Sequence, residues 1–508
     1  SSDLYADFMV NINKRIDDFT VVVNAGTSLS DNSSDLLGYG GPIRDTGVPN
    51  VFNVFDLDNA KKRATQEGSE EMTQSIFASA EIGWKSMLYL TLTGRNDWAS
   101  QLKGSNPTSF FYPSVGLSAV ISEMVTLPKA IDYLKVRGSF SSVGTPYPRF
   151  LVQPTYSYDP TKQDWNAKTH YPIGKLKPER TDSWEIGVDG TFFKDFKVSG
   201  SFYYANTYNQ TFDPKITVSS GYSTLYVQTG YVRNLGVEGL LSYGHTWRDF
   251  GWNSNFTFSW NKNKIVELVK DYVHPETGEI VNKDRLELKG LGYTKFILKE
   301  GGTLGDLYTN ADFIRDNKGY IQIDKNGDVA KTDNLPDIKL GSVFPKANLA
   351  WNNSFSYKGI YAGFQLSARL GGIVYSATQA ALDQYGVSEA SAAARDRGGV
   401  LVNGRSWVNA QQYYEIVATS SGLPQYYTYS ATNLRLQEAH IGYTIPRKWL
   451  GNICDINVSV VGRNLWMIYC KAPFDPEAIA TTNNFYQGID YFMMPSTRNF
   501  GFNVKINF

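Results

Sequence analysis

The chain has 508 residues, and its 49 basic side chains balance its 49 acidic ones, so no charge excess points to nucleic acid or to an acidic partner. No apolar run reaches the roughly 18 residues that a transmembrane helix needs, which excludes helical membrane spans. Aromatic residues make up 14% of the chain and 45 residues are glycine, a composition that suits closely packed strands with aromatic belts.

Fifteen segments with the character of β-strands follow one another along the chain. They cover residues 5–14, 19–29, 73–84, 87–97, 110–122, 132–143, 181–193, 196–208, 231–244, 251–262, 345–357, 360–371, 430–445, 454–466 and 497–508. Each has about 10 residues or more, the length with which a tilted strand crosses a bilayer. The sequence therefore predicts an all-β chain.

Apolar and polar side chains alternate within these segments. Trp184 and Ile186 alternate with Glu185 and Asp189, and the closing segment 497–508 places aromatic and aliphatic side chains on one face only. The charged residues of two segments fall on the polar face: Lys135, Arg137, Glu185 and Asp189. An apolar face against lipid and a polar face against a watery lumen is the pattern of a transmembrane strand, although a solvated β-sandwich would share it.

The connections between the segments alternate in length, which favours the membrane barrel over the sandwich. Short turns such as RIDD after the first segment are followed by long loops. The long loops are about 30–72, 98–109, 144–180, 209–230, 263–344, 372–429 and 467–496. Outer-membrane barrels have short periplasmic turns and long extracellular loops, so we expect a transmembrane antiparallel β-barrel with these loops outside the cell.

The strand count and the first residues suggest that earlier strands are missing. If the last strand ends in the periplasm, counting back through fifteen strands puts Ser1 on the extracellular side. Bacterial single-chain barrels have even strand numbers, and the opening SSDLYADFM has no signal-peptide pattern. We expect the chain to start within an extracellular loop, through a proteolytic nick or another cut, and to lack the strands before it.

Several motifs in order along the chain resemble one known family. They are LTGRNDW (92–98), FFYPSVGLSAVISE (110–123), LKVRGSFSSVGT (134–145), LKPERTDSWEIGVDGTFF (176–193), NLGVEG (234–239), GGTLGDLY (301–308), TNLRLQEAHIGYTIP (432–446), VVGRNLWMIYCKAPFDPE (460–477) and the closing FGFNVKINF. Together they resemble the SusC/RagA-type TonB-dependent outer-membrane transporters of Bacteroidetes. Barrels of this kind have about 22 strands and a plugged lumen. The resemblance implies that residues 1–508 form the C-terminal portion of one such barrel, without its plug domain.

The resemblance also implies a function and partners. The implied function is active import of a nutrient oligomer, an oligosaccharide or an oligopeptide, across the bacterial outer membrane. A SusD-like lipoprotein would capture the substrate and close over the extracellular loops. TonB would supply energy through the N-terminal plug and barrel portion, which is possibly a separate chain that closes the same barrel in the outer-membrane lipid.

Two other functions remain open at this stage. A passive porin-like channel would share the alternation of faces, and a surface adhesin or scaffold would bind partners without transport. Glycan and peptide recognition both use Tyr, Trp, Asn, Asp and Arg, so these residues do not identify the substrate, and glycan is preferred only as the family's more common cargo.

No catalytic motif is found, so we predict that the protein is not an enzyme and has no cofactor or metal. The histidines have no ligand spacing: His170, His245, His274 and His440. Asp324–Asp328 resembles a calcium loop, but the positions that need Gly and Glu hold Val329 and Leu335, so we interpret it as an exposed Asx turn. Cys454 and Cys470 flank one predicted strand, which would hold them roughly 50 Å apart, so we expect free thiols.

Polar and aromatic residues near the expected extracellular rim are the candidates for substrate binding, with the aromatic girdle and ordinary loop packing as the alternative. They are Arg95, Asn96, Asp97 and Trp98 at a strand end, Tyr156, Tyr158 and Trp165 in the 144–180 loop, and Trp407, Tyr413 and Tyr414 in the 372–429 loop. The alanine-rich stretch 376–395 predicts a helix in the latter loop. This helix would pack either on the lipoprotein lid or on its own loop.

Overall fold

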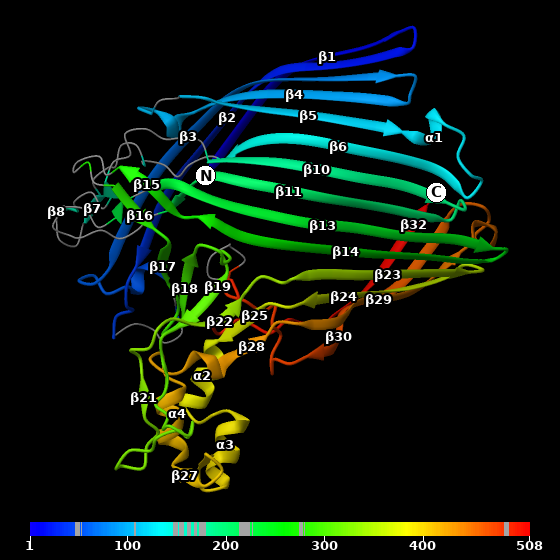
Figure 1. Cartoon of the computed structure of the whole chain (residues 1–508). Helices are drawn as coiled ribbons and strands as arrows, with labels where there is room; N and C mark the ends of the chain where they lie inside the picture. The colour runs from blue at the N-terminus through cyan, green and yellow to red at the C-terminus, as the bar shows by residue number, and fades with distance from the viewer. Residues whose placement is uncertain are drawn as a thin grey trace.

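A computed structural model describes residues 1–45, 51, 53–105, 108–145, 151, 157–159, 164–166, 170–171, 179–212, 224–225, 227–273, 278, 280–481 and 487–507. Among these residues, fifteen strands form one sheet in which strands adjacent in this series pair side by side (Figure 1). They are β1 (Ser2–Ile16), β2 (Phe19–Gly40), β3 (Arg63–Trp84), β4 (Leu88–Ala99), β5 (Phe110–Val120), β6 (Ile131–Thr145), β10 (Glu179–Phe192), β11 (Phe196–Phe212), β13 (Val227–Trp247), β14 (Phe250–Glu267), β23 (Ala347–Tyr357), β24 (Ile360–Leu370), β29 (Asn433–Ile445), β30 (Asp455–Cys470) and β32 (Asn499–Asn507). All neighbouring pairs are antiparallel, as the alternating connections predict.

All fifteen predicted segments are confirmed as strands, but several are longer than predicted. The register of β2 and β3 continues from Phe19↔Trp84 to Gly40↔Arg63, so the connection predicted at 30–72 is reduced to 41–62. Residues 30–40 lack regular alternation, because both faces of a strand that extends past a membrane meet water. Periodicity therefore cannot mark where such a strand ends.

The two faces of the sheet carry the side chains that the alternation predicts. Phe140 and Trp184 are paired on one face with ring centroids 4.7 Å apart, and the Trp184 side chain is exposed on that surface. On the opposite face, Arg137 Nη1 lies 2.5 Å from Asp189 Oδ2, and Ser199 Oγ donates to the same carboxylate at 2.6 Å. We call the apolar surface the outer face and the polar surface the inner face.

The connections lie on two edges of the sheet, because consecutive strands are antiparallel. The short-turn edge holds turns such as 17–18, 193–195, 248–249 and 358–359, and the long-loop edge holds the long connections. Lys85 and Ser86 have φ values of 49° and 57°. Positive φ at both central residues is typical of the type I′ turn of a tight β-hairpin.

Parts of three long connections fold together beyond the long-loop edge into what we call the loop module, residues 285–346, 373–430 and 487–490. It contains the four-stranded sheet β17 (Arg285–Lys289), β18 (Lys295–Lys299), β19 (Asp306–Thr309) and β22 (Ile338–Ser342), and the three-stranded sheet β28 (Thr428–Ser430), β25 (Ile373–Ser376) and β31 (Ile489–Asp490). Its own apolar core includes Phe296, Leu307, Val343 and Ile489, all nearly inaccessible to solvent. Figure 1 shows its helices at the bottom of the view, away from the large sheet.

The helix predicted at 376–395 is present as two helices, α2 (Ala377–Gln384) and α3 (Glu389–Asp396). Gly386 adopts a φ of 69° after α2, and Ser388 caps α3 in a reciprocal capping box with Ser391. A third helix, α4 (Ala410–Val417), was not predicted. The buried Ala380 and Ala394 side chains pack within the loop module itself.

Smaller strands lie in the long connections: β7 (Ser157–Asp159), β8 (Asp164–Asn166), β9 (His170–Tyr171), β12 (Thr224–Leu225), β15 (Val269–Val273), β16 (Ile280–Lys283), β20 (Asp312–Phe313), β21 (Lys331–Thr332), β26 (Val400–Val402) and β27 (Ser406–Val408). The one-turn helix α1 (Ile121–Met124) lies between β5 and β6 on the short-turn edge. In the part of the chain that the structure describes, no helix is long and apolar enough to cross a membrane.

The Asx-turn interpretation of Asp324–Asp328 is confirmed. Asp324 Oδ1 accepts the backbone N–H groups of Asn326 at 2.8 Å and Asp328 at 3.0 Å, and Gly327 takes a φ of 87°. Cys454 and Cys470 are both free thiols. Over the described ranges, no three His, Cys, Asp or Glu side chains gather as a metal site would require.

Candidate functional site: a cavity at a fork in the sheet

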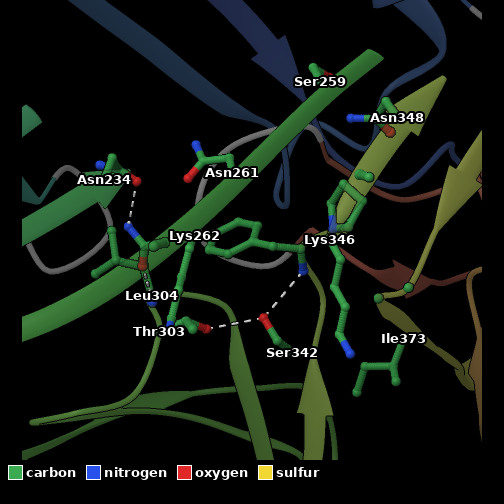
Figure 2. Close-up of a pocket in the computed structure, with 16 residues that line it drawn as sticks. Asn234, Ser259, Asn261, Lys262, Thr303, Leu304, Ser342, Lys346, Asn348 and Ile373 are labelled. Atoms are coloured by element: carbon green, nitrogen blue, oxygen red, sulfur yellow. Dashed lines mark hydrogen bonds between the residues drawn. The ribbon is translucent and has the colours of Figure 1, made fainter. Parts of the chain in front are cut away.

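The sheet forks at the long-loop edge, where β14 separates from β23. β14 pairs with β13 as far as Glu267, but its pairing with β23 ends at Trp260↔Ala347. Beyond that point the chain before β23 turns into the loop module through β22. A cavity of about 720 Å³ occupies the fork, within the size range of small-molecule sites (Figure 2).

One side of this cavity, which we call the fork cavity, is the inner face of the sheet. Its side chains come from alternate positions of three strands: Asn234 of β13, Ser259, Asn261 and Asn263 of β14, and Asn348 of β23. Asn263 donates to Asn234 Oδ1 at 3.0 Å and accepts the Leu304 N–H at 2.9 Å, which fixes the wall against the loop module. The side chains of Ser259, Asn261 and Asn348 make no hydrogen bond to other described residues and are available to a ligand.

The loop module forms the other side of the fork cavity. Thr303 Oγ1 and Ser342 Oγ lie 3.0 Å apart, and Ser342 Oγ accepts the Phe344 N–H at 3.4 Å. Gly371 and Gly372 have φ values of 79° and 81°, where the chain reverses between β24 and the module. Only glycine adopts this backbone without strain, and a Cβ at Gly372 would lie 3.1 Å from the Val343 carbonyl oxygen.

A second cavity of about 480 Å³ extends along the sheet from the first. The two cavities share Ser259 and Asn348, and the second also contacts Arg137, Glu238 and Thr257. Arg137 is neutralised there by Asp189 and by Glu185, whose Oε1 lies 3.5 Å from Arg137 Nη2. The two cavities thus adjoin along the inner face, from the loop module towards the middle of the sheet, and the side chains that they share are polar.

The predicted residues at the end of β4 lie on both faces of the sheet. Arg95 Nε donates to Asp97 Oδ1 at 2.7 Å, and its Nη2 donates to Ser75 Oγ at 2.7 Å, on the inner face. Asn96 and Trp98 occupy the alternate, outer-face positions of the strand. The proposed contact of these four residues with substrate remains a prediction.

The predicted aromatic residues lie in two other places. Tyr158 and Trp165 face each other across the β7–β8 hairpin with ring centroids 5.3 Å apart, and both side chains are exposed. Tyr156 lies outside the described residues. Trp407 is exposed on β27 of the loop module.

Tyr413 and Tyr414 of α4 pack on the core of the loop module. The Tyr413 ring lies 6.3 Å from that of Phe313, and burial raises the pKa of Tyr413 to about 12. Burial, followed by the nearby Asp383 carboxylate, also raises the pKa of Tyr414. The structure therefore places the predicted site residues in three separate groups, and none of the described ones lines either cavity.

Sequence reasoning missed the asparagines of the fork cavity, although a signal for them exists. Asn261 and Asn263 continue the inner-face positions of β14 past the last outer-face aromatic residue, Trp260. A polar face that continues where the apolar face stops marks the part of a strand above the lipid. The pattern does not show that β23 diverges there, so it predicts polar side chains but no cavity.

Comparison with known proteins agrees with this architecture. The family described as TonB dependent receptor-like, beta-barrel, matches residues 3–465. TonB-dependent receptor P3 of Formosa agariphila is 24% identical over 463 residues, which are 85% of this chain and 45% of that protein. TonB-dependent receptor SusC of Bacteroides thetaiotaomicron is 21% identical over 429 residues, 77% of this chain and 40% of SusC. The chain thus spans less than half the length of these relatives.

Among solved structures, the chain is similar to the RagAB peptide transporter. The TM-score is 0.75 at 16% identity, over 100% of this chain and 56% of that one. A second RagAB structure, in an open-open state, gives a TM-score of 0.71. The shared fold and the family match confirm the predicted all-β transmembrane barrel architecture and its outer-membrane location. This chain belongs to the TonB-dependent receptor β-barrel family, with SusC/RagA-type proteins among its relatives.

Proposed function

We propose that the protein is an active importer of nutrient oligomers, either glycans or oligopeptides, that works across the outer membrane with energy from TonB. Family membership supports TonB dependence, and the motif resemblance supports a SusC-like role. A plug and further barrel strands would complete the transporter. RagAB is a peptide transporter, and SusC is found among the relatives, so both substrate classes remain candidates.

The observation that carries this proposal is the pair of adjoining cavities along the inner face, with polar side chains of the sheet in their walls. The fork cavity and the second cavity adjoin at Ser259 and Asn348, which line both. Polar side chains with free donors and acceptors can exchange hydrogen bonds with a hydrated oligomer as it moves, which an apolar wall cannot do. Adjoining cavities of this kind suit passage of a solute better than attachment to a fixed partner.

The long-loop edge is the proposed extracellular side, where a SusD-like lipoprotein would cover the cavities. The exposed Tyr158, Trp165 and Trp407 rings lie on this edge or in the loop module and offer aromatic faces to an arriving oligomer. Arg95 and Asp97 would present polar groups at the end of β4.

The test uses cells that carry the receptor, a deletion of its gene, or depletion of TonB. Each is incubated with a partial plant-polysaccharide hydrolysate and with a casein digest, and mass spectrometry follows the loss of oligomers from the medium. We expect loss from one mixture only when both receptor and TonB are present. Loss that continues without TonB would instead identify a porin-like channel, and surface binding without loss would identify an adhesin.

A variant at Asn348, which lines both cavities, tests whether the solute passes through them. Asn348→Trp places a large ring where the two cavities meet, so uptake should fall strongly while the amount of folded receptor stays unchanged. Lys318→Met, an exposed residue in a turn of the loop module, is the matched control and should transport normally. Equal uptake by Asn348→Trp and Lys318→Met receptors would show that the solute takes another path.

A further inference from the structure

The fork cavity has an unbalanced charge. Lys262 and Lys346 line it, and none of its lining residues is Asp or Glu. Neither lysine forms an ion pair with any described residue. In the view of Figure 2, Lys262 extends towards Thr303 and Lys346 towards Ile373, so their ammonium groups reach the cavity from two different elements.

The carboxylate that contacts Thr303 of this lining is already occupied. Thr303 connects the cavity to Asp306, whose side chain accepts the Thr303 Oγ1–H at 2.7 Å and contacts Lys339 Nζ at 2.5 Å. Asp306 is 1% exposed and cannot turn towards Lys262 or Lys346 without losing these partners. Asp306 is therefore not a counter-charge for Lys262 or Lys346.

The backbone supports the position of Lys346. Its N–H donates to the Leu370 carbonyl at 2.8 Å, and its Cγ would lie 3.0 Å from a Cβ at Gly371. The aliphatic stem thus packs on a glycine that has no side chain to push it away. Asn261 and Asn348 also line the cavity and supply amide donors to further oxygen atoms of an anion.

We propose that the fork cavity binds carboxylate groups of an anionic oligomer and so selects acidic over neutral cargo. The proposal rests on the importer function and adds the substrate class to it. The second cavity does not share this preference, because Arg137 is paired there with Asp189 and Glu185, and Glu238 adds a negative charge. Anions are thus attracted at the entrance and not retained further along, as passage requires.

Carboxylate chemistry occurs in two kinds of oligomer, and the test separates them. Purified receptor in detergent is titrated with trigalacturonate and maltotriose as the acidic and neutral sugars, and with tetraglutamate and tetraglutamine as the acidic and neutral peptides. We expect tighter binding of the acidic member in at least one pair, with an affinity that falls as salt rises. The pair that responds identifies whether the carboxylates come from a glycan or a peptide.

Variants at the two lysines test the assignment. Each Lys→Met change should weaken binding of the acidic probe about fivefold, the effect of one charge contact in a wet site, and Lys262→Met/Lys346→Met about 25-fold. The matched control Lys318→Met should bind as the unchanged receptor does. Lys262→Arg/Lys346→Arg keeps both charges and should retain the preference, which separates loss of charge from loss of folding.

The inference is overturned if neutral and acidic probes bind equally, or if the Lys262→Met/Lys346→Met receptor keeps the preference. TonB-dependent uptake of neutral oligomers with no uptake of acidic ones would refute the inference alone and leave the importer function intact. Absence of any TonB-dependent uptake would instead refute the importer function.

Discussion

A buried ion pair between Arg435 and Asp475 holds the connection after β30 against the sheet. Arg435 Nη2 lies 2.6 Å from Asp475 Oδ1, and the two side chains are only 5% and 9% exposed. Arg435 Nη1 also donates to Asn464 Oδ1 at 3.2 Å, and Ser496 Oγ donates to the same Asp475 carboxylate. The interaction therefore joins β29, β30 and the two parts of the following connection that hold Asp475 and Ser496.

We predict that Arg435→Met releases this connection. Removing one partner of a buried pair leaves an uncompensated charge and costs about 3–5 kcal/mol. Asp475→Asn should cost less, because Arg435 retains Glu477 Oε2 at 3.3 Å and Asn464. Replacing both residues in Arg435→Met/Asp475→Leu should recover most of the loss, since an apolar pair has no charge to desolvate.

Hydrogen exchange of the backbone amides in residues 471–481, followed by mass spectrometry, measures this local stability. A loss of about 3 kcal/mol corresponds to roughly 150-fold faster exchange in the Arg435→Met receptor. Exchange within about threefold of the unchanged protein, or an equal effect of Asp475→Asn, would refute the reasoning.

The pH dependence of amide exchange in residues 471–481 gives a second test of the Arg435–Asp475 pair. Burial acting alone would raise the pKa of Asp475, but the hydrogen bonds from Arg435 and Ser496 prevail and the pKa lies below its ordinary value. The pair therefore stabilises the fold at pH values above the ordinary Asp pKa of about 3.9, and this stabilisation is lost as the pH falls through the lowered pKa.

Two further predictions concern the sheet and the loop module. Gly442→Ala should destabilise the barrel by about 1–3 kcal/mol, because a Cβ there would overlap the Tyr361 ring. Gly501→Ala is the control, since its nearest atom would lie 3.6 Å away, and the temperature at which each receptor loses its folded migration on gels compares the two. In the module, burial raises the pKa of Tyr375 and Tyr413 to about 12. Resistance of the module to subtilisin should therefore be constant below the ordinary tyrosine pKa of about 10 and fall as the pH rises from there towards 12; an unchanged cleavage rate at pH 12 would contradict this.

The large sheet could be predicted from the sequence because its signal is local. Alternation within 183–191 assigns Trp184 to the outer face and Asp189 to the inner face without any knowledge of neighbouring strands. The ends of strands were less predictable. β2 and β3 continue to Gly40 and Arg63 through backbone pairing that leaves no periodic pattern once both faces meet water.

The loop module could be predicted only in part. The alanine-rich stretch indicated helix, and Gly386 and Ser388 are recognisable as the end of one helix and the cap of the next, yet they were interpreted as part of a single helix. The core that joins Phe296 to Ile489 connects residues almost 200 positions apart, and no local pattern encodes such contacts.

The fork cavity was beyond sequence reasoning for the same reason. It exists because β14 pairs past Trp260 with β13 alone, and a strand's choice of partners is not visible in its own alternation. The candidate residues chosen from the sequence were those at strand ends and in aromatic-rich loops. The cavity is lined instead by asparagine, serine and lysine side chains together with apolar residues such as Leu304 and Phe344. Residues of these types occur throughout the sequence and do not mark a site.

The most direct test of the account determines which side of the outer membrane each edge of the sheet faces. Cys454 and Cys470 are first replaced by serine, and single cysteines are introduced as Lys318→Cys in the loop module and Lys358→Cys in a short turn. Intact cells are then treated with a membrane-impermeant maleimide. The account predicts labelling of Lys318→Cys in intact cells and of Lys358→Cys only after the outer membrane is opened. Labelling of both positions in intact cells, or the reverse pattern, would contradict a barrel that opens its long loops to the outside.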